Sequence, residues 1–233
     1  MDTIQLPSYF PPRPPMDLDA STVAAFDRLL AEAVENGSGA AIDYTLAAPK
    51  WQFLCYLCEA KDLLLHGSAN PNIEEFEPRQ SNDSQEFGNR KAVYAASDGI
   101  WPMYFAIANR DGPVTSLTNA CFRLLQEDGT WSIPYYFFSI NNDAFEQNPW
   151  RNGTVYILPR ATFEQQEPDD FEGITAESEQ WASLVAVKPL AKLHITPDDF
   201  PFLSQVRAHN NRIQGERIRR NPNGFPWLDD REA

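Results

Sequence analysis

The sequence has few of the residues on which disulfide-bonded, metal-bound or phosphate-cradling folds depend. Its 233 residues include three cysteines and three histidines, and its 11 glycines do not cluster into a phosphate-binding loop. The odd, sparse cysteine count argues against a disulfide framework and favours a reducing compartment, so we expect a cytoplasmic location. Cys55 and Cys58 have no second pair to complete the four ligands of a zinc site, so we expect no metal.

Cations and long apolar runs are scarce as well. There are 19 Lys and Arg residues against 33 Asp and Glu residues, which gives a net charge of −14. A protein that binds a nucleic-acid backbone needs basic side chains facing phosphates, so nucleic acid is an improbable partner. No apolar run has the length of a membrane-spanning helix, and the N-terminus lacks a signal-peptide pattern. We therefore expect no membrane association.

The hydrophobic and proline residues indicate one globular domain preceded by an arm. Hydrophobic residues make up 42% of the chain, enough for a substantial core. Five of the 19 prolines fall within residues 1–18 and favour an extended arm, pinned to the domain surface by Tyr9 and Phe10. A Pro-rich docking ligand is the alternative reading of this arm. The domain then covers residues 19–220, and residues 221–233 form a tail.

Hydrophobic periodicity predicts an α+β fold. One helix is expected from Asp19 or Ser21 to about Gly37, a second from Pro49 to about Asp62, a short third from Asp98 to Arg110, and a polar fourth at 203–220. Strands are expected at 63–66, 92–96, 118–125, 131–140, 154–159, 183–188 and 191–195. The sequence Glu127-Asp128-Gly129-Thr130 indicates a hairpin turn. Helices before and between strands of mixed direction give the α+β class.

A polar group ends the first predicted strand. The apolar run Leu63-Leu64-Leu65 leads directly into His66, Gly67 and Ser68. Glycine in a strand often marks the close approach of a backbone or a ligand, so these three residues form a candidate polar shelf. A helix with Tyr104 and Phe105 follows the next predicted strand, which contains Tyr94. Two such rings can bracket a flat heterocycle, although Tyr104 and Phe105 can equally be core residues.

His66-Gly67-Ser68, followed by Tyr94 and an aromatic helix, resembles the NAD-binding core of the ADP-ribosyltransferase superfamily. The match covers about residues 63–108 and is closest to the His-Tyr-Glu branch of the poly(ADP-ribose) polymerases and the rifampin ADP-ribosyltransferases. The resemblance implies a split β-sheet core with N-terminal helices. It also implies that His66 bonds an NAD ribose, that the Gly67 backbone holds the nicotinamide carboxamide beside Ser68, that Tyr94 stacks on nicotinamide, and that Tyr104 or Phe105 closes the sandwich.

The third element of the family is an acidic residue or Gln that opens a late strand and bonds the ribose 2′-hydroxyl. Glu179 is the candidate, with Gln180 and Glu177 as alternatives. Such a carboxylate steadies the positive charge that grows as nicotinamide leaves. Alignment on the strand predicted at 183–188 instead places Ala182 or Ser183 at this point.

The resemblance implies that the chain cleaves the nicotinamide–ribose bond of NAD and transfers ADP-ribose to an unknown protein or small-molecule acceptor. A glycohydrolase, with water as acceptor, and a non-catalytic interaction protein that keeps the fold are the alternatives. The segment 164–179 contains seven acidic residues and no basic one. It could steer a basic acceptor to the site, or it could be a solvated loop.

Overall fold

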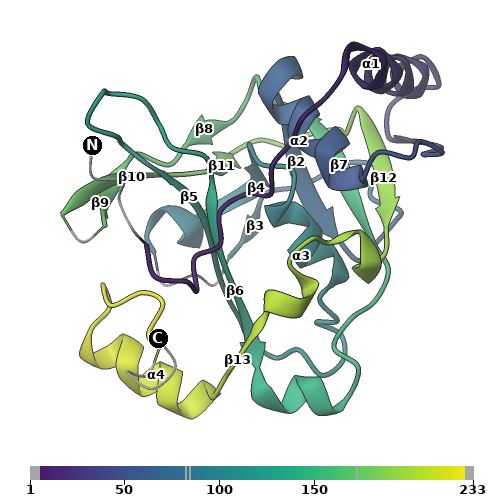
Figure 1. The fold of residues 1–233 in the computed structure, drawn as a ribbon. Helices are drawn as coiled ribbons and strands as arrows, with labels where there is room; N and C mark the ends of the chain where they lie inside the picture. Colours follow the sequence, from purple (N-terminus) through teal and green to yellow (C-terminus); the bar gives the residue numbers. More distant parts are fainter. Residues whose placement is uncertain (1–5, 82, 84, 172, 229–233) are drawn as a thin grey trace.

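The structure is a computed structural model that describes residues 6–81, 83, 85–171 and 173–228, and it has the predicted α+β composition (Figure 1). The α-helices in these residues are α1 (Ala20–Glu35), α2 (Lys50–Lys61), α3 (Trp101–Ile107) and α4 (Asn211–Arg220). Asp19 caps α1 by accepting a hydrogen bond from the Thr22 amide, and Asp62, in a left-handed conformation, is the C-cap that follows α2. The first two helices therefore begin and end where the sequence predicts.

The larger sheet contains the strands that carry the predicted motif. Its order is β1-β12-β7-β2-β4-β11-β8, and β3 pairs with β4 outside this path. The strands are β1 (Ala40–Ala41), β2 (Leu63–Ser68), β3 (Arg79–Gln80), β4 (Lys91–Ala96), β7 (Gly153–Pro159), β8 (Glu164–Gln165), β11 (Gln180–Ser183) and β12 (Ala191–Ile195).

The smaller sheet has the order β13-β6-β5-β10-β9. Its strands are β5 (Leu117–Leu124), β6 (Tyr135–Asn141), β9 (Asp169–Phe171), β10 (Ile174–Ser178) and β13 (Arg207–His209). The predicted hairpin turn connects β5 and β6, with Leu125 bridging Trp131 and Gly129 in the left-handed region at φ 81°. The chain passes from the smaller sheet to the larger one between β10 and β11, and Glu179 is the residue at this crossing.

The core lies on both faces of the larger sheet. On one face α2 and α3 pack against β2 and β7, where Phe53, Leu65 and Ile157 are fully buried. On the other face Leu64, Val93, Ala95 and Tyr156 form a second cluster with Phe76. The successive residues Leu64 and Leu65 of β2 thus enter different clusters, because successive side chains of a strand point to opposite faces.

Three sequence predictions about elements are wrong. The strand expected at 183–188 lies earlier, since β11 ends at Ser183, and Leu184 and Val185 are exposed. The helix expected at 203–220 is interrupted by β13, so that α4 begins at Asn211. The acidic segment is not a simple loop, because it supplies β8, β9 and β10, whose backbones pair even where their side chains are exposed. Glu172 of this segment lies outside the described residues.

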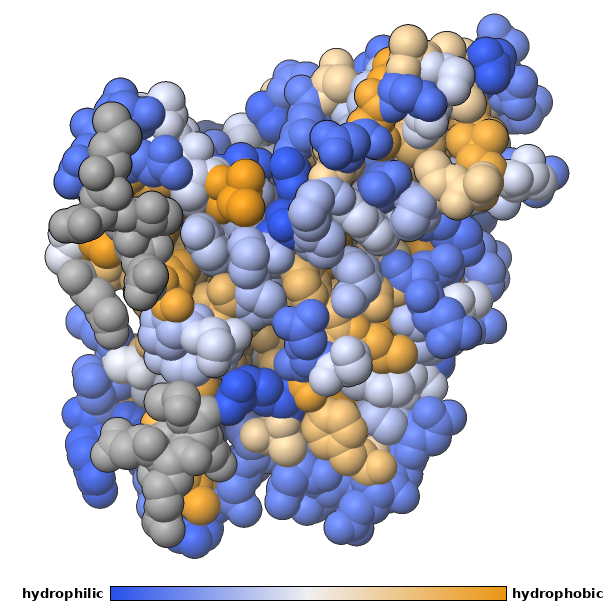
Figure 2. All heavy atoms as spheres, in the orientation of Figure 1, coloured by the Kyte–Doolittle hydropathy of each residue, from blue (hydrophilic) through white to orange (hydrophobic). Residues whose placement is uncertain are grey.

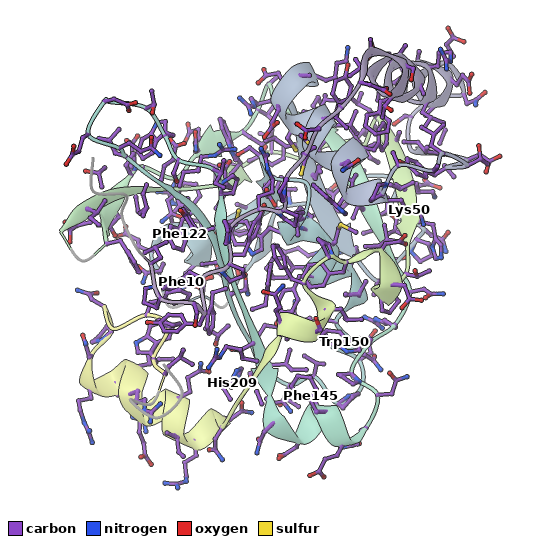
Figure 3. All side chains as sticks on the ribbon, in the orientation of Figure 1. Phe10, Lys50, Phe122, Phe145, Trp150 and His209 are labelled. Atoms are coloured by element: carbon purple, nitrogen blue, oxygen red, sulfur yellow. The ribbon has the colours of Figure 1, made fainter. Side chains whose placement is uncertain are left out.

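The Pro-rich arm packs along the smaller sheet, as the sequence predicts for its described part. Pro12 bridges Tyr135 of β6, and the Tyr136 amide donates to the Pro11 carbonyl at 3.1 Å. Phe10 is 3% exposed and its ring lies 5.3 Å from that of Phe122. Both residues are labelled in Figure 3. The arm then crosses to α1 (Figure 1). A buried aromatic ring and paired backbone fix its path.

A polar cluster attaches the C-terminal elements to the smaller sheet. His209 at the end of β13 lies with Nε2 2.7 Å from Ser116 Oγ and Nδ1 2.8 Å from Ser139 Oγ (Figure 3). Burial lowers the pKa of His209 to about 4, against the opposing effect of a hydrogen bond to Asn211. The imidazole is therefore neutral in the folded protein at pH 7.

Hydrophilic residues cover most of the face drawn in Figure 2. Within the described residues, no helix combines the length and apolar character that crossing a bilayer requires.

Candidate functional site

The predicted motif residues lie where two strands of the larger sheet separate. β2 pairs with β7 along its whole length, from Leu63 to Ser68. Its pairing with β4 consists of Leu65 opposite Ala96. His66, Gly67 and Ser68 therefore lie beyond the contact that joins β2 to β4, and the two strands diverge at the motif.

His66 reaches across this divergence to β4. Its Nδ1 lies 2.7 Å from the backbone oxygen of Tyr94, and its ring centroid lies 4.7 Å from that of Phe76. A carbonyl oxygen can only accept, so Nδ1 carries the proton and Nε2 is the acceptor in the neutral ring. Burial lowers the pKa of His66, and the bond to Tyr94 opposes that shift. The imidazole thus has a fixed tautomer.

Gly67 is explained by the close approach of α3. A Cβ atom at this position would lie 1.8 Å from the backbone oxygen of Pro102, so no side chain fits. The sequence interpretation of a shelf open to a ligand is therefore wrong for the side-chain face of Gly67. The role of its backbone groups in holding a carboxamide stays a prediction.

Ser68 and Tyr94 have local hydrogen-bond partners. Ser68 Oγ accepts from the Asn70 amide at 3.1 Å. The Tyr94 hydroxyl donates to the Phe87 carbonyl at 2.9 Å and accepts from the Arg90 amide at 2.8 Å. Burial raises the pKa of Tyr94. These bonds hold the phenol at the motif end of β4.

The two aromatic candidates on α3 differ in burial. Tyr104 has no exposed surface, and its hydroxyl donates to the Ser139 carbonyl at 2.8 Å. Tyr104 is therefore a core residue rather than one side of a ligand sandwich. Phe105 is half-buried with its ring 5.8 Å from that of Tyr104, so Phe105 is the remaining candidate.

Glu179 occupies the crossing between the two sheets. Its amide donates to the Cys121 carbonyl of β5 at 3.2 Å, and its own carbonyl accepts from the Ser97 amide, after β4, at 3.0 Å. One residue is thereby paired to both sheets. Glu179 stands immediately before β11, so a carboxylate does open a late strand, although that strand lies at 180–183 rather than at 183–188.

The Glu179 carboxylate is buried and fully engaged. The residue is 4% exposed. Oε1 accepts from Nε of Arg123, and Oε2 accepts from the hydroxyl of Ser97. Trp181 Nε1 in turn donates to Ser97 Oγ at 2.9 Å. Charge-assisted bonds of this kind are stronger than neutral ones and fix the orientation of the carboxylate.

A cavity of about 300 Å³ opens beside this carboxylate. Most of its lining residues are charged or aromatic, and the described ones are Cys58, Glu59, Ser97, Arg123, Trp131, Arg160, Gln165, Glu177, Glu179 and Trp181. The Arg160 guanidinium lies 4.3 Å from the Trp181 ring centroid, and Arg160 Nε is buried without a hydrogen-bond partner among the described residues. Burial, and then the charge of Glu179, raise the pKa of Glu177.

The predicted site residues form two groups in this structure. Glu179 and its alternative Glu177 line the cavity, whereas Gln180 does not and, by strand alternation, faces away from Glu179 and Trp181. The motif residues 66–68, Tyr94 and the α3 aromatics are not among the described lining residues either. Sequence reasoning missed Arg123 and Ser97. A lone arginine within the apolar run of β5 is the signal that could have identified Arg123.

The described residues contain no group of three or more His, Cys, Asp or Glu side chains placed to hold a metal. Cys55, Cys58 and Cys121 are free and buried, and burial raises the pKa of each thiol. Comparisons with protein-family models, with curated proteins and with solved structures found no match for this chain.

Proposed function

We propose that this protein is an NAD-dependent ADP-ribosyltransferase that cleaves the nicotinamide–ribose bond and transfers ADP-ribose to an acceptor. The observation that carries the proposal is the buried, oriented carboxylate of Glu179, which opens β11 next to the strand of Tyr94 and borders a cavity. A second observation supports the proposal. β2 and β4 diverge at His66, which suits the split sheet that the resemblance implies.

The proposed chemistry is substitution at the anomeric carbon of the nicotinamide ribose. The C1′–N bond breaks, its electron pair goes to the nicotinamide ring, and the ribose becomes positively charged. Glu179 accepts a hydrogen bond from the 2′-hydroxyl and stabilises this charge. A lone pair of the acceptor then bonds to C1′, and the acceptor's proton leaves to solvent. With water as acceptor the same steps make a glycohydrolase.

The remaining motif residues hold NAD in this proposal. The Nδ1 proton of His66 is committed to the Tyr94 carbonyl, so Nε2 accepts from a ribose hydroxyl. The backbone groups of Gly67, on the strand that diverges from β4, form hydrogen bonds with the carboxamide of nicotinamide. Tyr94 and Phe105 supply ring faces for nicotinamide. Ser97 and Arg123 hold the Glu179 carboxylate before substrate arrives, which lowers the reorganisation needed in the transition state.

A non-catalytic interaction protein with the same fold is the second candidate. The observation that favours it is the occupancy of both Glu179 oxygens by Arg123 and Ser97. A carboxylate used only to join β5 to β4 would be structural, and binding of NAD would then have no chemical outcome.

Release of nicotinamide from NAD by the purified full chain tests the proposal. We expect release by the wild-type protein, and a loss of at least about tenfold in His66→Ala, because an NAD ribose contact disappears. A chain that binds NAD without releasing nicotinamide, with or without added basic peptide or small-molecule acceptors, would favour the non-catalytic candidate.

A further inference from the structure

A line of alternating charges joins the N-terminal arm to Glu179. The guanidinium of Arg13 donates to Glu59 Oε1 near the end of α2. The same Oε1 lies 3.8 Å from the terminal NH2 nitrogen of Arg123. Arg123 Nε donates to Glu179. Two cations and two carboxylates thus alternate from the arm to the cavity wall.

The backbone of the arm places Arg13 at the start of this line. The Arg13 amide donates to the Pro134 carbonyl at 2.9 Å, beside the Pro12–Tyr135 bridge. Phe10 anchors the arm three residues earlier by burying its ring against the smaller sheet. The Arg13 side chain is 15% exposed. Its charge is therefore delivered to one place, next to a Glu59 side chain that is 37% exposed and partly screened by water.

Arg123 has acceptors on two sides. Its NH1 nitrogen donates to the Ser132 carbonyl at 3.3 Å, Nε donates to Glu179, and NH2 faces Glu59. With Arg13 in place, the negative charge of Glu59 is compensated by the hydrogen-bonded Arg13 guanidinium as well as by the more distant Arg123. Without Arg13, Glu59 would be left with Arg123 as its cation and would pull that guanidinium away from Glu179.

We propose that Arg13 is a positioning residue for Glu179 and acts through Glu59 and Arg123, so that the N-terminal arm is part of the catalytic unit. The catalytic consequence rests on the proposed function, whereas the coupling of Arg13 to Arg123 does not. A displaced Arg123 leaves the Glu179 carboxylate less well oriented toward the ribose. A small misplacement of this kind reduces the rate of the chemical step more than it reduces substrate binding.

The test uses the full chain in four forms: wild type, Arg13→Met, Arg13→Lys and Arg212→Met. Arg212→Met is the matched control, because it removes an arginine from an exposed ion pair with Glu216 on α4. The first readout is the NMR resonance of the Arg123 Nε proton and its exchange with water, assigned by its loss in Arg123→Lys. The second readout is kcat and KM for nicotinamide release from NAD.

In Arg13→Met we expect the Arg123 Nε resonance to move and its exchange to accelerate at least about tenfold. We also expect kcat to fall about tenfold with KM for NAD unchanged. Arg13→Lys should recover part of both effects because it keeps the charge, and Arg212→Met should change neither.

An unchanged Arg123 Nε resonance in Arg13→Met would overturn the coupling, whatever the activity. An unchanged kcat beside a shifted resonance would overturn the positioning role. Absence of nicotinamide release by the wild type would contradict the proposed function alone, and the resonance would still decide the coupling. Should Arg13→Met fail to fold, Arg13→Lys carries the test, with a smaller shift expected and no shift overturning the coupling.

Discussion

Two regions differ in how the chain is packed: the motif end of β2, at His66, Gly67 and Ser68, and the corner at Glu179, where the chain crosses from one sheet to the other. Around Gly67 the chain is packed so closely that a methyl group would lie 1.8 Å from the Pro102 oxygen. Around Glu179 the chain instead encloses charged groups beside a cavity of about 300 Å³. Packing accounts for the glycine without any ligand. Packing does not account for a buried carboxylate, because an ionised group loses hydration on burial and needs compensating partners. The corner is therefore the stronger indication of function.

The largest expected effect is on the packed side of this comparison. Gly67→Ala should lower the free energy of unfolding by about 3 kcal/mol or more, since a clash with backbone atoms cannot be relieved by a side-chain rotation. Urea unfolding measures the change. Gly215→Ala is the matched control, because the nearest atom to its added Cβ is Arg219 NH1 at 3.7 Å and the site is helical. A Gly67→Ala protein as stable as the control would contradict the packing explanation.

Acid should affect the buried carboxyl groups near the corner and the buried histidines elsewhere in opposite directions. Burial raises the pKa of Glu177 and Asp98 near the corner, so these groups favour the folded state as the pH falls. Burial lowers the pKa of His66 and His209, so these groups favour the folded state at high pH. The contribution of His209 is complete above its unfolded pKa of 6.5 and is lost as the pH falls toward about 4.

His209→Gln removes the contribution of one buried histidine to the pH dependence of stability. Between pH 7 and pH 5, the wild type should lose about 2 kcal/mol of stability through His209 alone, and the variant should lack that part of the dependence. Thermal unfolding at the two pH values measures it. Identical pH dependence in both proteins would show that His209 is not buried in its neutral form.

Substitutions of two neighbouring aromatic residues on α3 should have smaller effects, which distinguish the core residue Tyr104 from the candidate binding residue Phe105. Tyr104→Phe removes the hydroxyl that donates to Ser139, which should cost about 1 kcal/mol of stability and leave nicotinamide release unchanged. Phe105→Ala should instead raise KM for NAD if Phe105 supplies the stacking face. Paired measurements of unfolding and of KM would distinguish them, and a raised KM in Tyr104→Phe would return Tyr104 to the site.

The elements that the sequence predicts well are those with a clear periodic signal. β2, β4 and β7 contain apolar runs between turn residues, and β12 alternates apolar and polar residues. α1 has a capping Asp19 with apolar residues at helical spacing. The sequence does not predict β8 and β9, because they are two and three residues long and mostly polar. It does not predict β10 either, because the alternation of Ile174 and Ala176 is short and lies within an acidic segment. Local pattern cannot indicate strands that depend on distant partners.

The candidate site was predicted in part for a similar reason. Glu179 lies between Ser178 and Gln180, and such a polar context is typical of a solvated turn. Its burial depends on Arg123, which is 56 residues earlier in the chain, and on Ser97, which is 82 residues earlier. At Gly67 the sequence predicts the close approach of a backbone or a ligand and cannot distinguish the two, and in the structure it is the backbone of α3 that approaches.

The most direct test of the account is the initial rate of nicotinamide release from NAD by Glu179→Gln beside the wild type. The variant keeps the shape of the side chain and removes its charge. We expect kcat to fall about 10²–10³-fold with KM for NAD nearly unchanged, as for loss of a group that acts in the transition state. Release by the wild type at a rate that Glu179→Gln matches would contradict the central claim that this carboxylate carries the chemistry.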